Sequence, residues 1–174
     1  MIKKVLLCAF LTVCSGCAKD PLKPPATLSF VSVEREESLL YAVRYQSDID
    51  VLDLFGRGER VGMVSGMLRC ALADDHDFTV GNAMQFSAFG LVRSDENAQQ
   101  KGTFTYFTRA FMVETSSDRS SERNLSIAEL NHLLSNKQKI PCKVVVTAYG
   151  YKPYYSNTLY IPVADLLREI NRPR

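Results

Sequence analysis

The stretch TFTYFTRAFMVET, which runs from Thr103 to Thr115, decides the fold. Aromatic and β-branched side chains favour a β-strand, in which alternate residues face opposite sides. One side carries Phe107, Phe111 and Val113, and the other carries Tyr106, Thr108 and Ala110. Because both sides carry aromatic or apolar groups, we predict that this strand lies in the middle of a sheet.

Six more segments of the chain have strand character. They are rich in Val, Phe, Tyr and Thr, and polar or glycine-containing turns separate them. They are Leu28–Val33, Leu39–Gln46, Val61–Leu72, Ala83–Arg93, Cys142–Tyr149 and Asn157–Ile161. The polar run Ser94–Gly102 is predicted to be a hairpin loop between two long strands, and Ser116–Asn124 is predicted to be a surface loop.

Two short helices are predicted in the C-terminal third. The first, Ile127–Asn136, starts at a capping box formed by Ser126 and Glu129. Its apolar stripe consists of Ile127, Leu130, Leu133 and Leu134. The second begins at Pro162, and its apolar stripe consists of Val163, Leu166, Leu167 and Ile170. Both stripes are spaced to lie against a sheet.

Together these elements predict an α+β, β-rich fold. We expect an antiparallel sheet or sandwich of about seven strands with two short covering helices. Residues 28–174 are long enough to form a single β-rich globular domain with its own core.

The first residues have the order of an export signal. Lys3 and Lys4 provide a positive start, and Val5–Val13 is an apolar run too short to span a bilayer permanently. We predict that residues 1–16 are a lipoprotein signal peptide. The alternative is an ordinary cleaved signal that happens to contain a cysteine.

A lipidation signal follows the apolar run. Ser15-Gly16-Cys17 has the small–small–cysteine order of a lipobox, although Cys14 stands where lipoproteins usually carry an aliphatic residue. The chain thus resembles bacterial lipoproteins, which implies that Cys17 receives the lipid. Residues 17–27 contain three prolines and are predicted to be an extended tether. Ala18 is not the Asp of an inner-membrane retention signal, which favours the periplasmic face of the outer membrane.

Charge and cysteine content restrict the partners and the compartment. The chain has 21 Lys and Arg against 19 Asp and Glu, and Lys3 and Lys4 lie in the signal, so the remainder is close to neutral. A neutral domain argues against a nucleic-acid partner.

Of the five cysteines, Cys70 and Cys142 remain after the predicted processing and lipidation. Because export leads to an oxidising compartment, we predict a disulfide between them; two buried free thiols are the alternative.

No catalytic constellation is recognisable. Asp74-Asp75-His76-Asp77 lacks the glycine and distal glutamate of a calcium loop, so a solvated turn is the simpler interpretation. Ser65 has the wrong spacing to its flanking glycines for a nucleophile elbow, and a strand bulge is favoured there. His132 falls off the apolar stripe of its helix. We therefore predict no enzyme activity, no metal site and no cofactor.

Two segments have the composition of a protein-binding surface. Tyrosine offers a large contact area, a hydroxyl group and little rotamer entropy. The tyrosine segment supplies Tyr149, Tyr151, Lys152, Tyr154 and Tyr155 as candidates, unless two of the four tyrosines belong to the core. The acidic strip supplies Asp48, Asp50 and Asp53, which suit a basic cleft; a solvated strand edge is the alternative.

A family resemblance adds a specific function. The signal and the block from Ile140 to Leu167 resemble the immunity lipoproteins that protect Gram-negative cells from type VI secretion phospholipase effectors. The resemblance implies a membrane-anchored periplasmic protein that binds a phospholipase toxin and either occludes or distorts its active site, without chemistry of its own. No individual binding residue carries over. A structural or assembly lipoprotein of the envelope or of a secretion apparatus is the alternative, and an enzyme or small-molecule carrier comes third.

Overall fold

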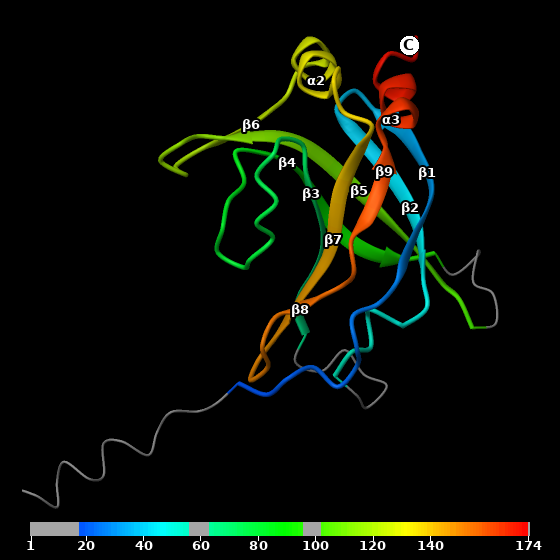
Figure 1. Cartoon of the computed structure of the whole chain (residues 1–174), viewed down its shortest axis with the longest axis vertical. Coiled ribbons are helices and arrows are strands. Elements are labelled where there is room, and N and C mark those ends of the chain that lie inside the picture. Colours follow the sequence, from blue (N-terminus) through cyan, green and yellow to red (C-terminus); the bar gives the residue numbers. More distant parts are fainter. Residues whose placement is uncertain (1–17, 56–62, 96–101, 174) are drawn as a thin grey trace, which may run out of the picture.

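Figure 1 shows the computed structural model, which describes residues 18–55, 63–95 and 102–173. The predicted signal peptide, Cys17 and most of the predicted hairpin loop at 94–102 lie outside these ranges. Within them, nine strands form one antiparallel sheet, and two helices lie together at one end of it. The predicted β-rich α+β class is confirmed.

The strand order places the deciding stretch inside the sheet. The strands are β1 (Leu28–Glu37), β2 (Leu40–Ser47), β3 (Met63–Ala71), β4 (Phe86–Ser94), β5 (Phe104–Thr115), β6 (Glu122–Asn124), β7 (Lys139–Ala148), β8 (Tyr154–Tyr155) and β9 (Leu159–Pro162). They run in the order β1-β2-β5-β4-β3-β7-β8, with β6 beside β5 and β9 beside β7. β5 therefore lies between β2 and β4, as its sequence predicts.

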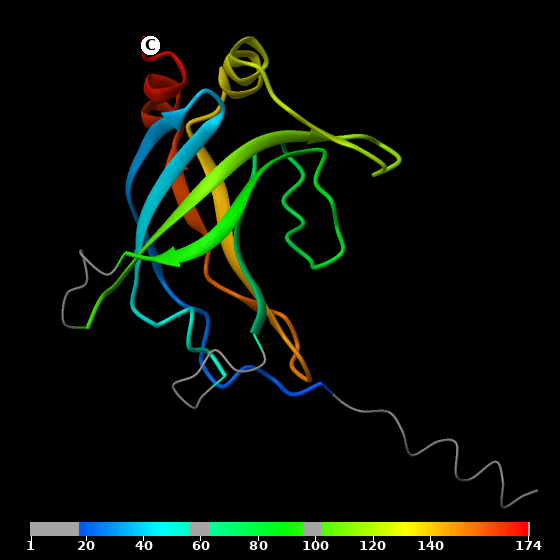
Figure 2. The same ribbon diagram turned by 180° about the vertical axis from the view of Figure 1, so that it is seen from behind.

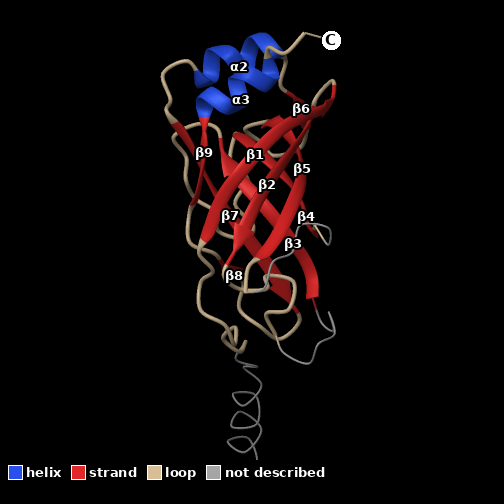
Figure 3. Ribbon diagram, turned by 90° about the vertical axis from the view of Figure 1, so that its right-hand side faces the viewer, coloured by secondary structure: helices blue, strands red, loops and turns tan. Residues whose placement is uncertain are grey.

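The sheet curls around a single interior. β1 at one edge of the strand order contacts β9, and Figure 3 shows the strands wrapping around a common axis. Tyr41, Tyr45 and Tyr106 point into this interior and are at most 1% exposed. The hydroxyl oxygens of Tyr45 and Thr108 lie 3.2 Å apart, so these two buried polar groups satisfy each other.

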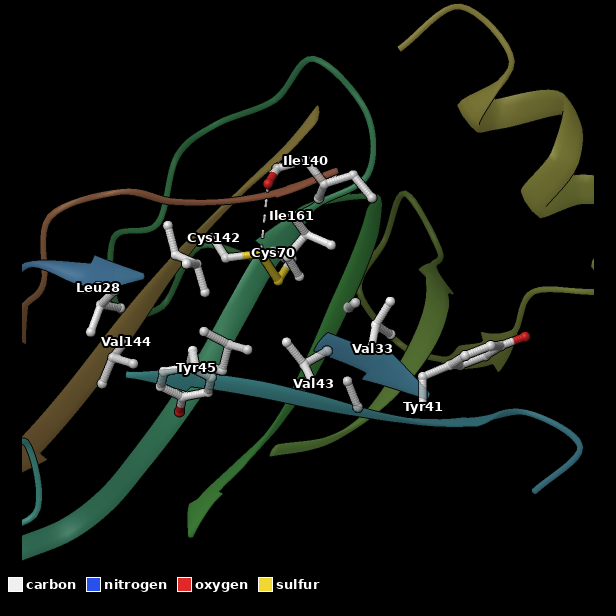
Figure 4. Packing of buried hydrophobic residues seen from close by; sticks show 14 of the residues in the cluster. Leu28, Val33, Tyr41, Val43, Tyr45, Cys70, Ile140, Cys142, Val144 and Ile161 are labelled. Carbon is white, nitrogen blue, oxygen red and sulfur yellow. Dashed lines mark hydrogen bonds between the residues drawn. A yellow bond between two sulfur atoms is a disulfide. The ribbon is translucent and has the colours of Figure 1, made fainter. Parts of the chain in front are cut away.

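Cys70 of β3 and Cys142 of β7 form a disulfide within this core. The two residues are direct partners in the register of the strands, and their Cα atoms are 4.0 Å apart. Figure 4 shows the sulfur pair among buried side chains such as Val33 and Val144. The predicted pairing is confirmed.

The helices close one end of the curled sheet. α2 (Ile127–Leu134) begins at the predicted capping box: Ser126 Oγ accepts the N–H of Glu129, and Glu129 accepts the N–H of Ser126. It ends at Leu134, two residues before the predicted end at Asn136. α3 (Val163–Ile170) has Pro162 as its N-cap, so this proline ends β9 and precedes the first helical turn. α3 packs on β1 and β9, and α2 packs on α3 (Figure 3).

β1 continues past its predicted end at Val33 to Glu37, despite the charged residues that follow. The guanidinium group of Arg35 is buried and donates to the carbonyls of Ile170 and Arg172 at the C-terminal end of α3. Carbonyls at this end of a helix lack partners and carry partial negative charge, so they suit a cation. This contact lets a charged segment complete the strand and joins it to the last helix.

Two short strands were not predicted. β6 lies within the predicted surface loop Ser116–Asn124, because Asn124 pairs with Val113 of β5 and the hairpin between them is tight. Asp118 accepts hydrogen bonds from Ser116 and Ser120 in that turn, which lowers the pKa of Asp118 to about 2. β8 forms because Tyr154 and Tyr155 pair with Val146 and Val145.

We expect the disulfide to supply a large part of the stability. It closes a separation of 72 residues, so replacing both cysteines (Cys70→Ala with Cys142→Ala) lowers the free energy of unfolding by about 4 kcal/mol. Urea unfolding followed by circular dichroism measures the loss. The parent protein unfolded under reducing conditions is the control and reproduces the effect; equal midpoints with and without reductant contradict it.

Candidate functional site

The tyrosine segment lies at the end of the molecule opposite the helices (Figure 1). Tyr149 is 83% exposed in the turn between β7 and β8, where Gly150 has a φ of 74° that favours glycine. The ring of Tyr151 packs against Phe55, with 4.7 Å between ring centroids. The Tyr155 hydroxyl accepts the N–H of Val80 at 3.1 Å. Of the predicted tyrosine contacts, Tyr149 is the most accessible to a partner.

Tyr154 is 3% exposed and holds the N-terminal segment. Its hydroxyl accepts the N–H of Ala26 at 2.6 Å and donates to the carbonyl of Pro24 at 2.9 Å. Burial raises the pKa of Tyr154, so the hydroxyl stays protonated and able to donate. The predicted tether covers residues 17–27. Its described part, residues 18–27, therefore lies against the domain and does not extend away from it.

The carboxylates of the acidic strip lie in a turn after β2. Asp48 accepts the N–H of Thr27 at 2.8 Å. Asp50 accepts from the N–H of Leu52 and from the hydroxyl of Tyr106, and the side chain of Asp53 lies 4.0 Å from that of Lys23. Burial, followed by the hydrogen bond to Asp50, raises the pKa of Tyr106. The three carboxylates therefore hold the turn after β2 and the N-terminal segment in place.

A different surface lies on the outer face of the sheet. Met67 of β3 pairs with Leu91 of β4, and Phe89 of β4 pairs with Phe111 of β5. Leu91 is 53% exposed and Phe111 is 44% exposed. The side of β5 that carries Phe107 and Phe111 is only partly covered, because the interior takes the other side.

The loop between β3 and β4 folds back over part of this face. The guanidinium group of Arg69 on β3 donates to the carbonyls of Phe78, Thr79 and Asn82. Phe78 and Met84 of the loop are buried against Ala71 in a small second core. Figure 2 shows the loop beside the β5–β6 hairpin, where Arg119 donates to the side chain of Asn82 at 3.2 Å.

The loop and the sheet together form a groove. One part has a volume of about 400 Å³ between the loop and the sheet, and a second part of about 300 Å³ continues over β4 and β5. The two parts share Met67 and Phe89. We call this surface the outer-face groove; the apolar residues of its second part are Met67, Phe89, Leu91 and Phe111. Ser65 also lines it, at an irregularity in the pairing of β3 with β7 that agrees with the predicted bulge.

Two arginines, Arg93 and Arg109, line the exposed part of the outer-face groove, and Arg44 lies near Phe107 on the same side of β5. The Nε atom of Arg109 lies 2.5 Å from Oε2 of Glu36, and this hydrogen bond raises the pKa of Arg109. Arg44 pairs with Asp95, and the guanidinium groups of Arg44 and Arg109 both lie within 6 Å of the Phe107 ring centroid. Arg93 lines the groove with an exposed side chain. The groove thus combines an apolar floor with a cationic margin.

The sequence contains only a partial signal for this groove. Phe107 and Phe111 alternate on one side of β5, and such a pattern suits a strand buried on both faces as well as an exposed aromatic patch. Leu91 and Met67 join them only through the pairing of distant strands.

The remaining predicted positions are solvated. Asp74 is exposed and pairs with Lys137, whose hydrogen bond lowers the pKa of Asp74. Hydrogen bonds from Thr79 lower the pKa of Asp77. Across the described ranges, no three His, Cys, Asp or Glu side chains gather as a metal would require. Nor is any helix there long and apolar enough to cross a bilayer.

Comparison with protein-family models, curated proteins and solved structures finds no match to this chain. The outer-face groove and the N-terminal sequence are the features that bear on function.

We expect Arg69 to stabilise the β3–β4 loop, which forms one side of the outer-face groove. Arg69→Met keeps the aliphatic stem but removes the three bonds to loop carbonyls, so local opening of the loop becomes easier by about 1 kcal/mol. Hydrogen exchange at the Asn82 N–H, which donates to Thr79 at 3.0 Å, reports the opening. Arg93→Met, on the same face, is the matched control and leaves this exchange rate unchanged. Equal rates in the parent and Arg69→Met contradict the assignment.

Proposed function

We propose that this chain is a lipid-anchored periplasmic protein that binds and neutralises a protein toxin, most specifically a type VI secretion phospholipase effector. The observation that carries the proposal is the outer-face groove, where Leu91 and Phe111 leave about half of their surface exposed beside arginines. Large apolar side chains gathered on a surface mark sites of association.

The composition of the groove favours a protein partner. Phe, Met and Arg are enriched in the cores of protein–protein interfaces, and a few such residues carry most of the binding energy. The sheet supplies a rigid platform, because Leu91 and Phe111 come from paired strands. A rigid platform loses little conformational freedom on binding, which favours high affinity.

The cationic margin suggests the chemistry of the partner. Arg109 and Arg44 are paired with carboxylates, whereas Arg93 lines the groove with an exposed side chain. We propose that the groove receives an apolar segment of the toxin that carries an acidic side chain next to Arg93. An Arg–carboxylate bond at the rim adds geometric specificity.

The proposed lipid at Cys17 places the binder where a phospholipase acts. Confinement at a membrane raises the effective concentration of the inhibitor near an enzyme that works on lipids. A stoichiometric inhibitor must bind tightly, in the nanomolar range or below, because each free enzyme molecule turns over many lipids.

We expect a single charge on the groove floor to abolish protection. Leu91→Asp and Phe111→Asp each place a carboxylate in the apolar contact and weaken binding of the proposed phospholipase effector by roughly 100-fold, or about 2.7 kcal/mol. Val31→Asp, at an apolar position of β1 that is 50% exposed and outside the groove, is the matched control. Calorimetry with the purified pair and survival on periplasmic co-expression of the toxin measure the effect.

If the parent protein neither binds that phospholipase at micromolar concentration nor protects the cell, immunity fails as the function. Retained association with envelope or secretion-apparatus proteins in the same strain then favours the assembly alternative. Wild-type binding by Leu91→Asp, Phe111→Asp and Val31→Asp alike removes the outer-face groove from the proposal.

We expect the anchor to depend on one thiol. Cys17→Ser removes the proposed attachment point, so the protein moves from the membrane to the soluble periplasmic fraction. Fractionation and metabolic labelling with a fatty acid follow this change. Cys14→Ser, in the signal itself, is the control that retains labelling. Unchanged labelling of Cys17→Ser contradicts lipidation at this position.

A further inference from the structure

The described chain begins on the tyrosine end of the domain. The N–H of Lys19 donates to the carbonyl of Gly150 at 2.8 Å, and the N–H of Lys152 donates to the carbonyl of Lys19 at 2.8 Å. Lys19 and Tyr151 form a parallel bridge, and the side chains of Asp20 and Lys152 form an ion pair at 2.9 Å. The N-terminal segment is thus fastened to the turn between β7 and β8.

This attachment restricts how far residue 17 can lie from the domain. Two covalent steps separate Cys17 from Lys19, so their Cα atoms are at most about 7.6 Å apart. Further along, Tyr154 and Asp48 hold Ala26 and Thr27, so the segment is tied at both ends. A lipid at Cys17 therefore brings this end of the domain close to the bilayer.

The side chains on this end suit a lipid–water interface. Tyr149 is 83% exposed and Leu22 is 68% exposed, and neither is part of the outer-face groove. Lys19, Lys23 and Lys152 lie on the N-terminal segment and the β7–β8 turn. Lys152 forms an exposed ion pair with Asp20, and Lys23 forms a partly exposed one with Asp53. Tyrosine rings and lysine side chains of this kind concentrate at headgroup level in membrane proteins.

We propose that the tyrosine end, defined by Leu22, Tyr149 and Lys152, rests on the lipid surface and fixes the orientation of the domain. The proposal rests on lipidation at Cys17, which is part of the proposed function. α2 and α3 then point away from the membrane, because they lie at the opposite end (Figure 1). The outer-face groove lies on the side of the sheet and stays accessible.

Single tryptophans test this orientation, because the chain has none of its own. Tyr149→Trp places the reporter on the tyrosine end. Tyr160→Trp is the matched control: Tyr160 is 47% exposed on β9, the strand that leads into α3. Each lipidated full-length protein is reconstituted into phosphatidylethanolamine–phosphatidylglycerol vesicles that contain lipids brominated in their acyl chains. Flotation confirms attachment in the same samples.

We expect blue-shifted emission and strong quenching for Tyr149→Trp, and neither for Tyr160→Trp. Leu22→Trp serves as a second reporter and gives the same result as Tyr149→Trp. Proteins that float but show equal quenching at both ends overturn the orientation and leave lipidation intact. Proteins that do not float overturn lipidation and the orientation with it, whereas loss of toxin binding in the calorimetric assay concerns the groove alone.

A flexible insertion separates the attachment of the segment from the lipid itself. About ten Gly and Ser residues between Ala18 and Lys19 span roughly 17 Å on average, enough to free the domain from the surface. With this insertion, flotation persists and the quenching of Tyr149→Trp falls towards that of Tyr160→Trp. Undiminished quenching would show that the short docked segment does not set the orientation.

Discussion

A curled sheet has one interior, and each of its strands can bury only one face there. In β5 the interior takes Tyr106, Thr108 and Ala110, which leaves Phe107 and Phe111 outside. Outer apolar residues need another cover, and the β3–β4 loop covers part of the face with Phe78 and Met84. The outer-face groove is the part that the loop leaves open.

The β1 edge of the sheet is covered by polar contacts rather than by a further strand. Beside β1, the carbonyl of Ala26 accepts the N–H of Asn157, and Arg35 binds the end of α3. An uncovered strand edge invites pairing with other chains, so these contacts protect the domain while the disulfide ties β3 to β7. The same contacts use Tyr154, which explains why a tyrosine-rich turn contributes to folding.

Local patterns predicted the elements well and the surfaces poorly. The capping box of Ser126 and Glu129 depends on residues three apart, and the pairing of Cys70 with Cys142 was predicted because the other three cysteines were assigned to the signal and to the lipid. The groove depends on the register of strands distant in sequence, which brings Leu91 beside Met67. Asp50 and Tyr154 could not be separated from surface residues by composition, because their partners, Tyr106 and Ala26, are also distant in sequence.

The N-terminal segment that follows the proposed lipidation position and the outer-face groove belong to different parts of the domain. The segment after Cys17 is bound at Gly150 and again at Tyr154, whereas the groove lies over β3, β4 and β5. A domain held by one end at a lipid surface presents its side to anything that moves along that surface. A lipid-cleaving enzyme must approach the same surface, so a sideways groove meets it in the plane where it works. Such a binder needs a stiff connection to the membrane more than a long reach, and we propose that the docked N-terminal segment supplies this connection.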